Sequence, residues 1–290
     1  MKWKSLIASA AALTFISAGY SCSPKSRTSS EGKTVPDTSG TEDSGELTVT
    51  FLSVGKADSM IIRSENSTVV IDCGERGDGK TIVKFLENQG VTAIDCLIVT
   101  HFDKDHVGGA AKVINSFEVK KVLTPDYQEF NQETEKFRNA MKERSIEPQL
   151  MRQNTVFELD GAEYTVYAPE KRFYGQDDSN DFSLVTKLVY HDSTFIFAGD
   201  AMEQRLNEVM DIGDCDLLKV PYHGRKIANL GEFVESVSPE YAVVCTSKEE
   251  FATSTRGILD DCGVTCWSTC YNGTVTAVTD GKTITVTSEK

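Results

Sequence analysis

The stretch Thr-His-Phe-Asp-Lys-Asp-His-Val-Gly-Gly, residues 100–109, carries the most information about this chain. It places two of the four histidines, His101 and His106, and two carboxylates, Asp103 and Asp105, within six residues. Side chains of this kind are costly to bury together unless a cation lies between them. A polar loop with a helix cap would account for one of the carboxylates only. The pattern therefore favours a metal site.

The residues on either side of this stretch predict where the site lies. Residues 93–100 form a continuous apolar run, which is typical of a strand that is buried on both faces. Gly108 and Gly109 allow close backbone packing at the start of the next helix, which is expected over 108–117. Open α/β folds place ligands at such strand ends, so we expect the site at one edge of a sheet.

Strand and helix patterns alternate along residues 47–290, and strand-turn-strand pairs recur among them. A doubly wound parallel sheet would lack such hairpins, so we expect an α/β sandwich of mixed sheets with helices outside. Hairpins or strand pairs are expected over residues 47–72, 155–168, 182–198 and 274–288. Helices are expected over residues 80–90, 108–117, 131–144, 203–210, 229–237 and 255–263.

The N-terminal segment has the features of an export signal. Residues 1–21 contain two lysines, an apolar stretch and then small residues, the order of a secretory signal peptide. Cys22 follows a small residue, as in the bacterial lipoprotein signal, where that cysteine carries the lipid; ordinary secretion is the alternative. Residues 22–46 are rich in Ser, Thr, Gly and acids and predict a flexible tether. We thus expect an exported protein, either lipid-anchored at a membrane or secreted, with one domain over 47–290.

The balance of charges limits the partners. The chain has 30 Lys and Arg against 44 Asp and Glu, which gives a net charge of −14. Such a chain is repelled by phosphate backbones, so non-specific binding of nucleic acid is disfavoured. A local group of cations can still hold a phosphorylated substrate. Lys104, Lys219 and Arg225 flank the motifs and are the candidates, with plain surface solvation as the alternative.

The order His-x-Asp-x-Asp-His at 101–106 resembles the His-x-His-x-Asp-His loop of metallo-β-lactamase-fold hydrolases, with Asp103 replacing the second histidine. Further stretches resemble, in order and spacing, the motifs of the branch related to the ComEC competence protein. They are FLSVGKADSMIIR (51–63), VVIDCG (69–74), NDFSLV (180–185), FIFAGD (195–200) and LLKVPYHG (217–224). The resemblance implies a four-layer αββα sandwich with two mixed sheets and the activity of a metal-dependent hydrolase.

The resemblance also implies a role for individual residues of the 101–106 loop. His101 and Asp103 resemble ligands of a first metal position, and Asp105 and His106 resemble ligands of a second. Asp200, at the end of an apolar strand, resembles the carboxylate that can bridge both metals.

Other positions depart from the family or play a supporting part. His223 resembles the last ligand, although Tyr222 precedes it where the branch often has a histidine. The third histidine of the classical fold, found between 170 and 190, is absent, and Asp181 or Asn180 stands at that place. Asp72 resembles a supporting carboxylate that orients a ligand histidine.

The expected chemistry follows from this ligand set. Replacing imidazole by carboxylate makes the site harder, which suits Mn²⁺ or Mg²⁺, with Zn²⁺ also possible. Two such ions about 3.5–4 Å apart make hydroxide at neutral pH and hold both oxygens of a phosphoryl displacement. We expect a hydrolase of phosphodiester bonds, nuclease-like or acting on cell-wall phosphoesters, with metal-bound hydroxide positioned by Asp105 or Asp200. The alternative is a non-catalytic extracellular binding module with a structural or vestigial metal, which the missing histidine favours.

Overall fold

A computed structural model describes residues 45–175 and 179–290. The predicted signal peptide, Cys22 and all but the last two residues of the predicted tether lie outside the described residues. Within the described ranges, no helix has the length and apolar character needed to cross a membrane.

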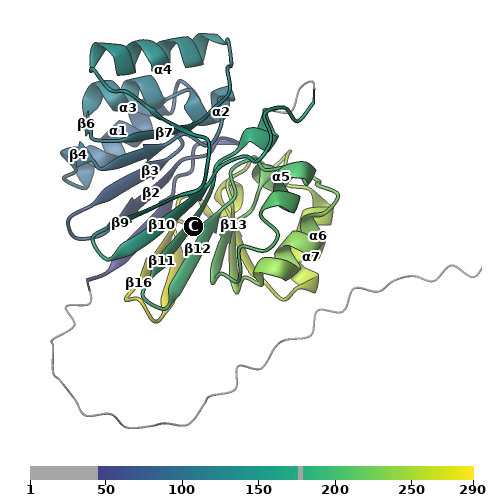
Figure 1. Ribbon diagram of the computed structural model, residues 1–290. Coiled ribbons are helices and arrows are strands. Elements are labelled where there is room, and N and C mark those ends of the chain that lie inside the picture. The colour runs from purple at the N-terminus through teal and green to yellow at the C-terminus, as the bar shows by residue number, and fades with distance from the viewer. Residues whose placement is uncertain (1–44, 176–178) are drawn as a thin grey trace, which may run out of the picture.

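Two large mixed sheets form the centre of the molecule (Figure 1). The first runs in the spatial order β17 (Ile284–Ser288), β16 (Val275–Thr279), β1 (Leu47–Phe51), β2 (Met60–Arg63), β3 (Thr68–Ile71), β5 (Cys96–Ile98), β7 (Val122–Pro125) and β8 (Gln149–Met151). The second runs β15 (Thr265–Ser268), β14 (Tyr241–Val244), β13 (Leu217–Lys219), β12 (Ser193–Phe197), β11 (Val185–Tyr190), β10 (Ala162–Tyr167) and β9 (Thr155–Leu159). Strands β4 (Ala93–Ile94) and β6 (Glu118–Val119) form a separate parallel pair.

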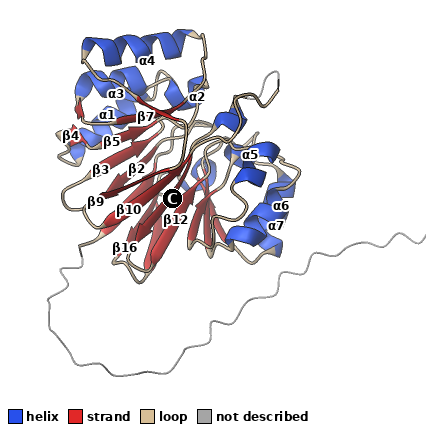
Figure 2. Cartoon of the chain, in the orientation of Figure 1, coloured by secondary structure: helices blue, strands red, loops and turns tan. Residues whose placement is uncertain are grey.

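Helices cover the outer face of each sheet (Figure 2). On the first sheet these are α1 (Gly79–Asn88), α3 (Ala110–Ser116) and α4 (Gln132–Glu143), and on the second they are α5 (Glu203–Glu208), α6 (Leu230–Val237) and α7 (Thr253–Asp261). Shorter elements are α2 (Lys104–Val107), α8 (Thr269–Asn272) and the 3₁₀ turns η1 (Asn180–Phe182) and η2 (Tyr222–Gly224). The predicted four-layer sandwich of two mixed sheets with helices outside is confirmed.

The two sheets are held together by a core of apolar side chains from their inner faces. Phe51 of the first sheet and Phe197 of the second lie with ring centroids 6.1 Å apart, and both are fully buried. Leu47 and Leu188 belong to the same cluster. Burying a side chain of this size contributes about 1.5–3 kcal/mol, so this layer supplies much of the stability of the domain.

Two of the predicted elements are divided in the structure. The apolar run 93–100 breaks at Asp95, whose carboxylate accepts the N–H of Thr68, so that β4 and β5 become separate strands. The helix expected over 108–117 begins only at Ala110, because Gly108 caps the end of α2 and Gly109 caps the start of α3. Both glycines pack so closely against neighbouring backbone that a Cβ would not fit.

The candidate metal ligands lie at one end of the sandwich, where the two sheets meet. The N–H of Leu184 donates to the carbonyl of Thr100 at 2.9 Å, which joins the segment after β5 to the segment before β11. The N–H of Asp200 donates to the hydroxyl of Ser183 at 3.1 Å, and the N–H of Tyr222 donates to the carbonyl of Gly199 at 3.2 Å. The loops that follow β5, β12 and β13 therefore lie together, and they contain residues singled out from the sequence.

Candidate metal centre

Three histidines from distant parts of the chain lie side by side at this end of the sheets. His101 precedes α2, His106 lies within it, and His223 lies in η2 after β13. The ring centroids of His101 and His106 are 4.1 Å apart, and those of His106 and His223 are 5.2 Å apart. All three rings are buried. The structure thus brings together the three histidines that the sequence singled out.

The first two rings are each fixed through their Nδ1 atom. His106 Nδ1 donates to Asp72 Oδ2 at 2.8 Å. The hydroxyl of Thr100 donates to the same carboxylate at 2.6 Å, so it is free to accept from His101 Nδ1, 3.1 Å away. A neutral ring that donates through Nδ1 carries its lone pair on Nε2. This is the arrangement of metal-ligating histidines, whose second nitrogen is held by a carboxylate or carbonyl.

The third ring reaches the same place through an unusual backbone conformation. Tyr222 and His223 both adopt positive φ, at 51° and 50°, and Gly224 follows at 72°. Two successive non-glycine residues in this region are strained, and such strain concentrates at functional sites. A Cβ at Gly224 would lie 2.7 Å from the side chain of Val244, so the turn requires glycine. His223 Nδ1 donates to the carbonyl of Cys245 at 3.0 Å, which again leaves Nε2 as the free nitrogen.

Asp200 faces the free nitrogens of two rings. Its Oδ1 lies 3.4 Å from His106 Nε2 and its Oδ2 lies 3.1 Å from His223 Nε2, while the two Nε2 atoms are 3.4 Å apart. Burial would raise the pKa of Asp200, but His223 and His106 lower it well below its usual value. Burial would likewise lower the pKa of His223, but Asp200 and Asp58 raise it to about 9. Two imidazoles and a carboxylate directed at one point suit a divalent cation.

A further buried carboxylate, Asp58, lies behind these rings. Ligand atoms of Asp58, His106, Asp200 and His223 lie within 4.8 Å of one another. Asp58, however, approaches the Nδ1 atoms, at 3.4 Å in His223 and 3.9 Å in His106, whereas Asp200 approaches the Nε2 atoms. We therefore assign Asp58 a supporting place and Asp200 a ligand place. The sequence analysis did not identify Asp58, although an aspartate two residues before the apolar strand β2 was a signal for it.

Lys219 is the partner of this carboxylate. Its ammonium group pairs with Asp58, donates to the carbonyl of Gly199 at 3.0 Å and lies 3.8 Å from Asp200 Oδ1. The side chain is fully buried, so it cannot hold a substrate phosphate in the way that the sequence suggested. Lys219 is buried because it belongs to β13, whose other residues are apolar and buried, and Asp58 compensates its charge there.

The cluster contains buried polar atoms whose bonding is incomplete within the described chain. His101 Nε2 and Asp200 Oδ1 make no hydrogen bond to a described residue, and Asp103 Oδ2 lies 3.7 Å from His101 Nε2. An unsatisfied buried polar atom costs about 1–3 kcal/mol. A cation bound between these atoms would remove that cost, so the residues fit the divalent metals that the ligand set suggests.

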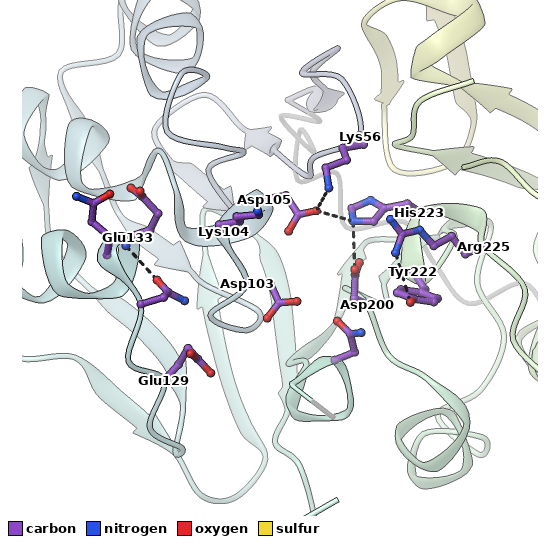
Figure 3. Close-up of a pocket in the computed structure, with 13 residues that line it drawn as sticks. Lys56, Asp103, Lys104, Asp105, Glu129, Glu133, Asp200, Tyr222, His223 and Arg225 are labelled. Carbon is purple, nitrogen blue, oxygen red and sulfur yellow. Dashed lines mark hydrogen bonds and ion pairs between the residues drawn. The ribbon is translucent and has the colours of Figure 1, made fainter. Parts of the chain in front are cut away.

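A cavity of about 640 Å³ opens over the cluster (Figure 3). Asp200 and His223 form part of its wall. Asp105 Oδ2 lies 3.5 Å from the ammonium of Lys56 and 3.7 Å from His223 Nε2, and dashed lines mark both contacts in Figure 3. Asp103 also lines the cavity, and its pKa, which burial would raise, is lowered to about 2 by its interaction with His101. The remaining lining residues are Lys104, Glu129, Asn131, Gln132, Glu133, Asn180, Tyr222 and Arg225.

Two of the predicted phosphate-binding side chains line the cavity, whereas Asp181, one predicted replacement for the third histidine, does not. Lys104 and Arg225 line the cavity as expected, and Lys56, which the sequence analysis did not single out, joins them. Asp181 is not part of the cavity wall, and its Oδ1 accepts the N–H groups of Met202, at 3.1 Å, and Arg205, at 3.0 Å. Its role as a metal ligand stays a prediction without support from these contacts.

Fold and site together define the class of protein. The family model of the metallo-beta-lactamase superfamily matches residues 52–248, and the chain belongs to that superfamily. Members of this superfamily depend on divalent metals, and the Asp and His cluster described above is able to hold one. Membership supports a hydrolase-type enzyme.

The chain is also similar to part of several competence-related proteins. ComE operon protein 3 of Bacillus subtilis is 26% identical over 227 residues, which is 71% of this chain and 29% of that protein. Competence protein ComA of Neisseria gonorrhoeae is 26% identical over 208 residues, or 68% and 27%. The chain thus spans less than a third of the length of these relatives. The structure of the metallo-beta-lactamase fold protein YhfI from Bacillus subtilis superposes with a TM-score of 0.53 at 10% identity, covering 77% of this chain and 96% of that one. The predicted resemblance to competence-related proteins is confirmed.

Proposed function

We propose that this chain is a metal-dependent hydrolase that cleaves phosphodiester bonds in the cavity. The observation that carries the proposal is the common orientation of His101, His106 and His223, each anchored through Nδ1 with Nε2 left free. When bound there, divalent cations supply Lewis acidity and an activated water. A site that opens into a cavity is accessible to substrate, whereas structural metal sites are closed.

In this proposal the ligands divide into two groups. One cation would be held by His101 and Asp103, and the other by Asp105, His106 and His223 together with Asp200, whose two oxygens face the Nε2 atoms of His106 and His223.

The charges of the cluster support two divalent ions. Five carboxylates lie in or directly against it, and two of them pair with an ammonium group, Asp58 with the buried Lys219 and Asp105 with Lys56. Together these side chains carry a net charge of −3, which is more than one divalent ion neutralises. The carboxylates are those of Asp58, Asp72, Asp103, Asp105 and Asp200.

The residues of the cavity wall have separate tasks in this proposal. Asp105 is partly exposed to the cavity and accepts a hydrogen bond from an attacking water, which orients it. Lys104 is exposed and makes no ion pair with another described residue, so it is available to a phosphate oxygen. Arg225 is held by Glu250 and lies 5.0 Å from the ring centroid of Tyr222, which presents its charge in a fixed position.

The size and charge of the protein support a limited range of substrates. The cavity admits a diester with a modest group on either side. The net charge of −14 disfavours long nucleic acid. We therefore propose a small phosphodiester, the end of a polymer or a cell-wall phosphoester as the substrate. The predicted export signal is consistent with a substrate outside the cytoplasm.

Turnover of bis-p-nitrophenyl phosphate tests the proposal. Protein stripped by a chelator and reloaded with Mn²⁺, Zn²⁺ or Mg²⁺ is expected to cleave this diester. Asp105→Asn is expected to lower kcat by about 100-fold or more, because it removes the carboxylate that takes up a proton from the attacking water. Glu129→Gln is the matched control, since Glu129 lines the same cavity but has no contact with the cluster that the structure records, and should leave turnover unchanged.

A loaded protein that is inert on phosphodiesters, phosphomonoesters, thioesters and lactams would contradict the proposal. That result would favour a binding module in which the metal is structural.

A further inference from the structure

The turn η1 is fastened at both ends to the residues of the first cation position. The hydroxyl of Ser183, directly after η1, lies 3.5 Å from His101 Nδ1 and accepts the N–H of Asp200 at 3.1 Å. Ser179, directly before η1, hydrogen-bonds to Asp103 and contributes to the lowered pKa of that carboxyl. The turn is therefore placed by the same side chains that would hold the first cation.

Asp181 within this turn is directed at a helix. Its Oδ1 accepts the N–H groups of Met202 and Arg205, where α5 begins. These N–H groups have no partner within the helix, so a carboxylate from another segment stabilises the helix start. The side chain is buried, and it does not line the cavity.

Asn180, its neighbour, faces the cavity instead. It lines the wall together with Asp103 and Asp200. Its Oδ1 atom is buried and makes no hydrogen bond to any described residue. Its Nδ2 atom lies 3.6 Å from the sulfur of Met202, which turns the amide oxygen away from Met202. A buried amide oxygen without a partner, in the wall of a site that lacks ligands on one side, is a candidate to bind a cation.

We propose that Asn180 Oδ1 is a ligand of the cation held by His101 and Asp103, and that Asp181 serves the start of α5. The inference rests on the metal centre of the proposed function and names a further ligand of it. It makes the first position rich in oxygen, with a single imidazole. A neutral amide oxygen and carboxylates suit Mn²⁺ or Mg²⁺ better than Zn²⁺, so the first position should prefer the harder ions.

Metal binding by four variants of the whole chain tests the inference without any measurement of turnover. Protein stripped by a chelator is titrated with Mn²⁺ against a fluorescent chelator, and the bound Mn²⁺ per chain is then measured by elemental analysis. Asn180→Ala is expected to weaken the first site by at least about 10-fold and to leave one tightly bound Mn²⁺ where the unaltered chain holds two. Asn180→Asp keeps the oxygen and should restore both. Asn180→His should raise the ratio of Zn²⁺ to Mn²⁺ affinity by at least about 10-fold.

Asp181→Ala is the matched comparison, because it changes the adjacent residue. It should lower the thermal midpoint of the metal-free protein and leave the Mn²⁺ content at two, whereas Asn180→Ala should leave that midpoint unchanged. If Asn180→Ala keeps both ions at unaltered affinity, or if Asp181→Ala loses one, the inference is wrong and the metal centre stands. If the unaltered chain itself fails to bind two ions, the proposed centre fails and the inference fails with it.

Discussion

Replacing Asp72 by asparagine tests whether this carboxylate sets the orientation of a metal ligand. Asp72 accepts the N–H of Thr100 at 2.8 Å through Oδ1, and through Oδ2 it accepts from His106 Nδ1. Asparagine keeps the first bond but places an N–H group where the second acceptor was. His106 would then hold its proton on Nε2, the nitrogen that faces Asp200, and could not offer a lone pair there.

The size of the effect follows from what the substitution leaves intact. Asp72 has a φ of 58°, a conformation that asparagine also adopts readily, so the backbone should be preserved. The loss of such a supporting partner costs about 10- to 100-fold in metal affinity, or about 1.4–2.7 kcal/mol. Competition titration of Mn²⁺ or Zn²⁺ against a fluorescent chelator at constant pH measures this change directly.

Asp95→Asn provides the control for this experiment. Asp95 also accepts a backbone N–H, that of Thr68, and pairs with Lys120. It precedes β5 in the sequence, however, whereas the ligands of the 101–106 loop follow that strand. Its replacement should leave metal affinity unaltered. A folded Asp72→Asn protein with unaltered metal affinity would show that His106 is not a ligand oriented through Asp72, and the reasoning about the centre would fail at that residue.

Three further predictions concern stability. The pKa of His223 is raised to about 9 in the fold, so its protonated form stabilises the metal-free protein. This contribution is complete below the unfolded pKa near 6.5 and is lost as the pH rises through 9. The urea midpoint measured in the presence of a chelator should therefore fall over that pH range. With Mn²⁺ present the trend should be offset, because binding requires neutral imidazole; a metal-free midpoint that rises from pH 7 to 9 would contradict the role given to Asp200. Lys219→Met should lower the free energy of unfolding by about 3–5 kcal/mol in urea titrations, since it leaves Asp58 buried without its partner; a loss below 1 kcal/mol would contradict this. Gly109→Ala should lower the free energy of unfolding by at least about 1–3 kcal/mol in the same assay, because its Cβ would lie 2.2 Å from the carbonyl oxygen of Cys73. An unaltered midpoint would show that the backbone around residue 109 moves to accommodate the methyl group.

Most of the fold could be predicted because its signals are local. The turns Asp160-Gly161 and Asp280-Gly281 lie where hairpins were expected, between β9 and β10 and between β16 and β17. The exceptions depend on contacts across the chain. Asp95 divides an apolar run because it bonds to Thr68, which is distant in the sequence. Strand β8 was not predicted, because its three residues are too few to show a strand pattern, and it is recognised only by its pairing with β7.

The site could be predicted only where several ligand-type residues share one short stretch. The 101–106 loop meets that condition, whereas Asp58 stands alone and was not identified. Burial was the second difficulty, because nothing in the sequence showed that Lys219 faces the interior. Direction was the third. Asn180 and Asp181 are adjacent in a tight turn, and spacing alone cannot tell which of them faces the cavity and which faces α5.

The division of the ligands between the two sheets has a consequence for the lifetime of the protein. The 101–106 loop follows β5 of the first sheet, while Asp200 and His223 follow β12 and β13 of the second. An ion bound among them joins both halves of the sandwich, and an ion present at 100 times its Kd adds about 2.7 kcal/mol to the native state. Scarcity of metal in the surroundings would then remove this contribution and raise the fraction of chains that are unfolded and open to proteases, so that abundance of the protein would follow the supply of the ion.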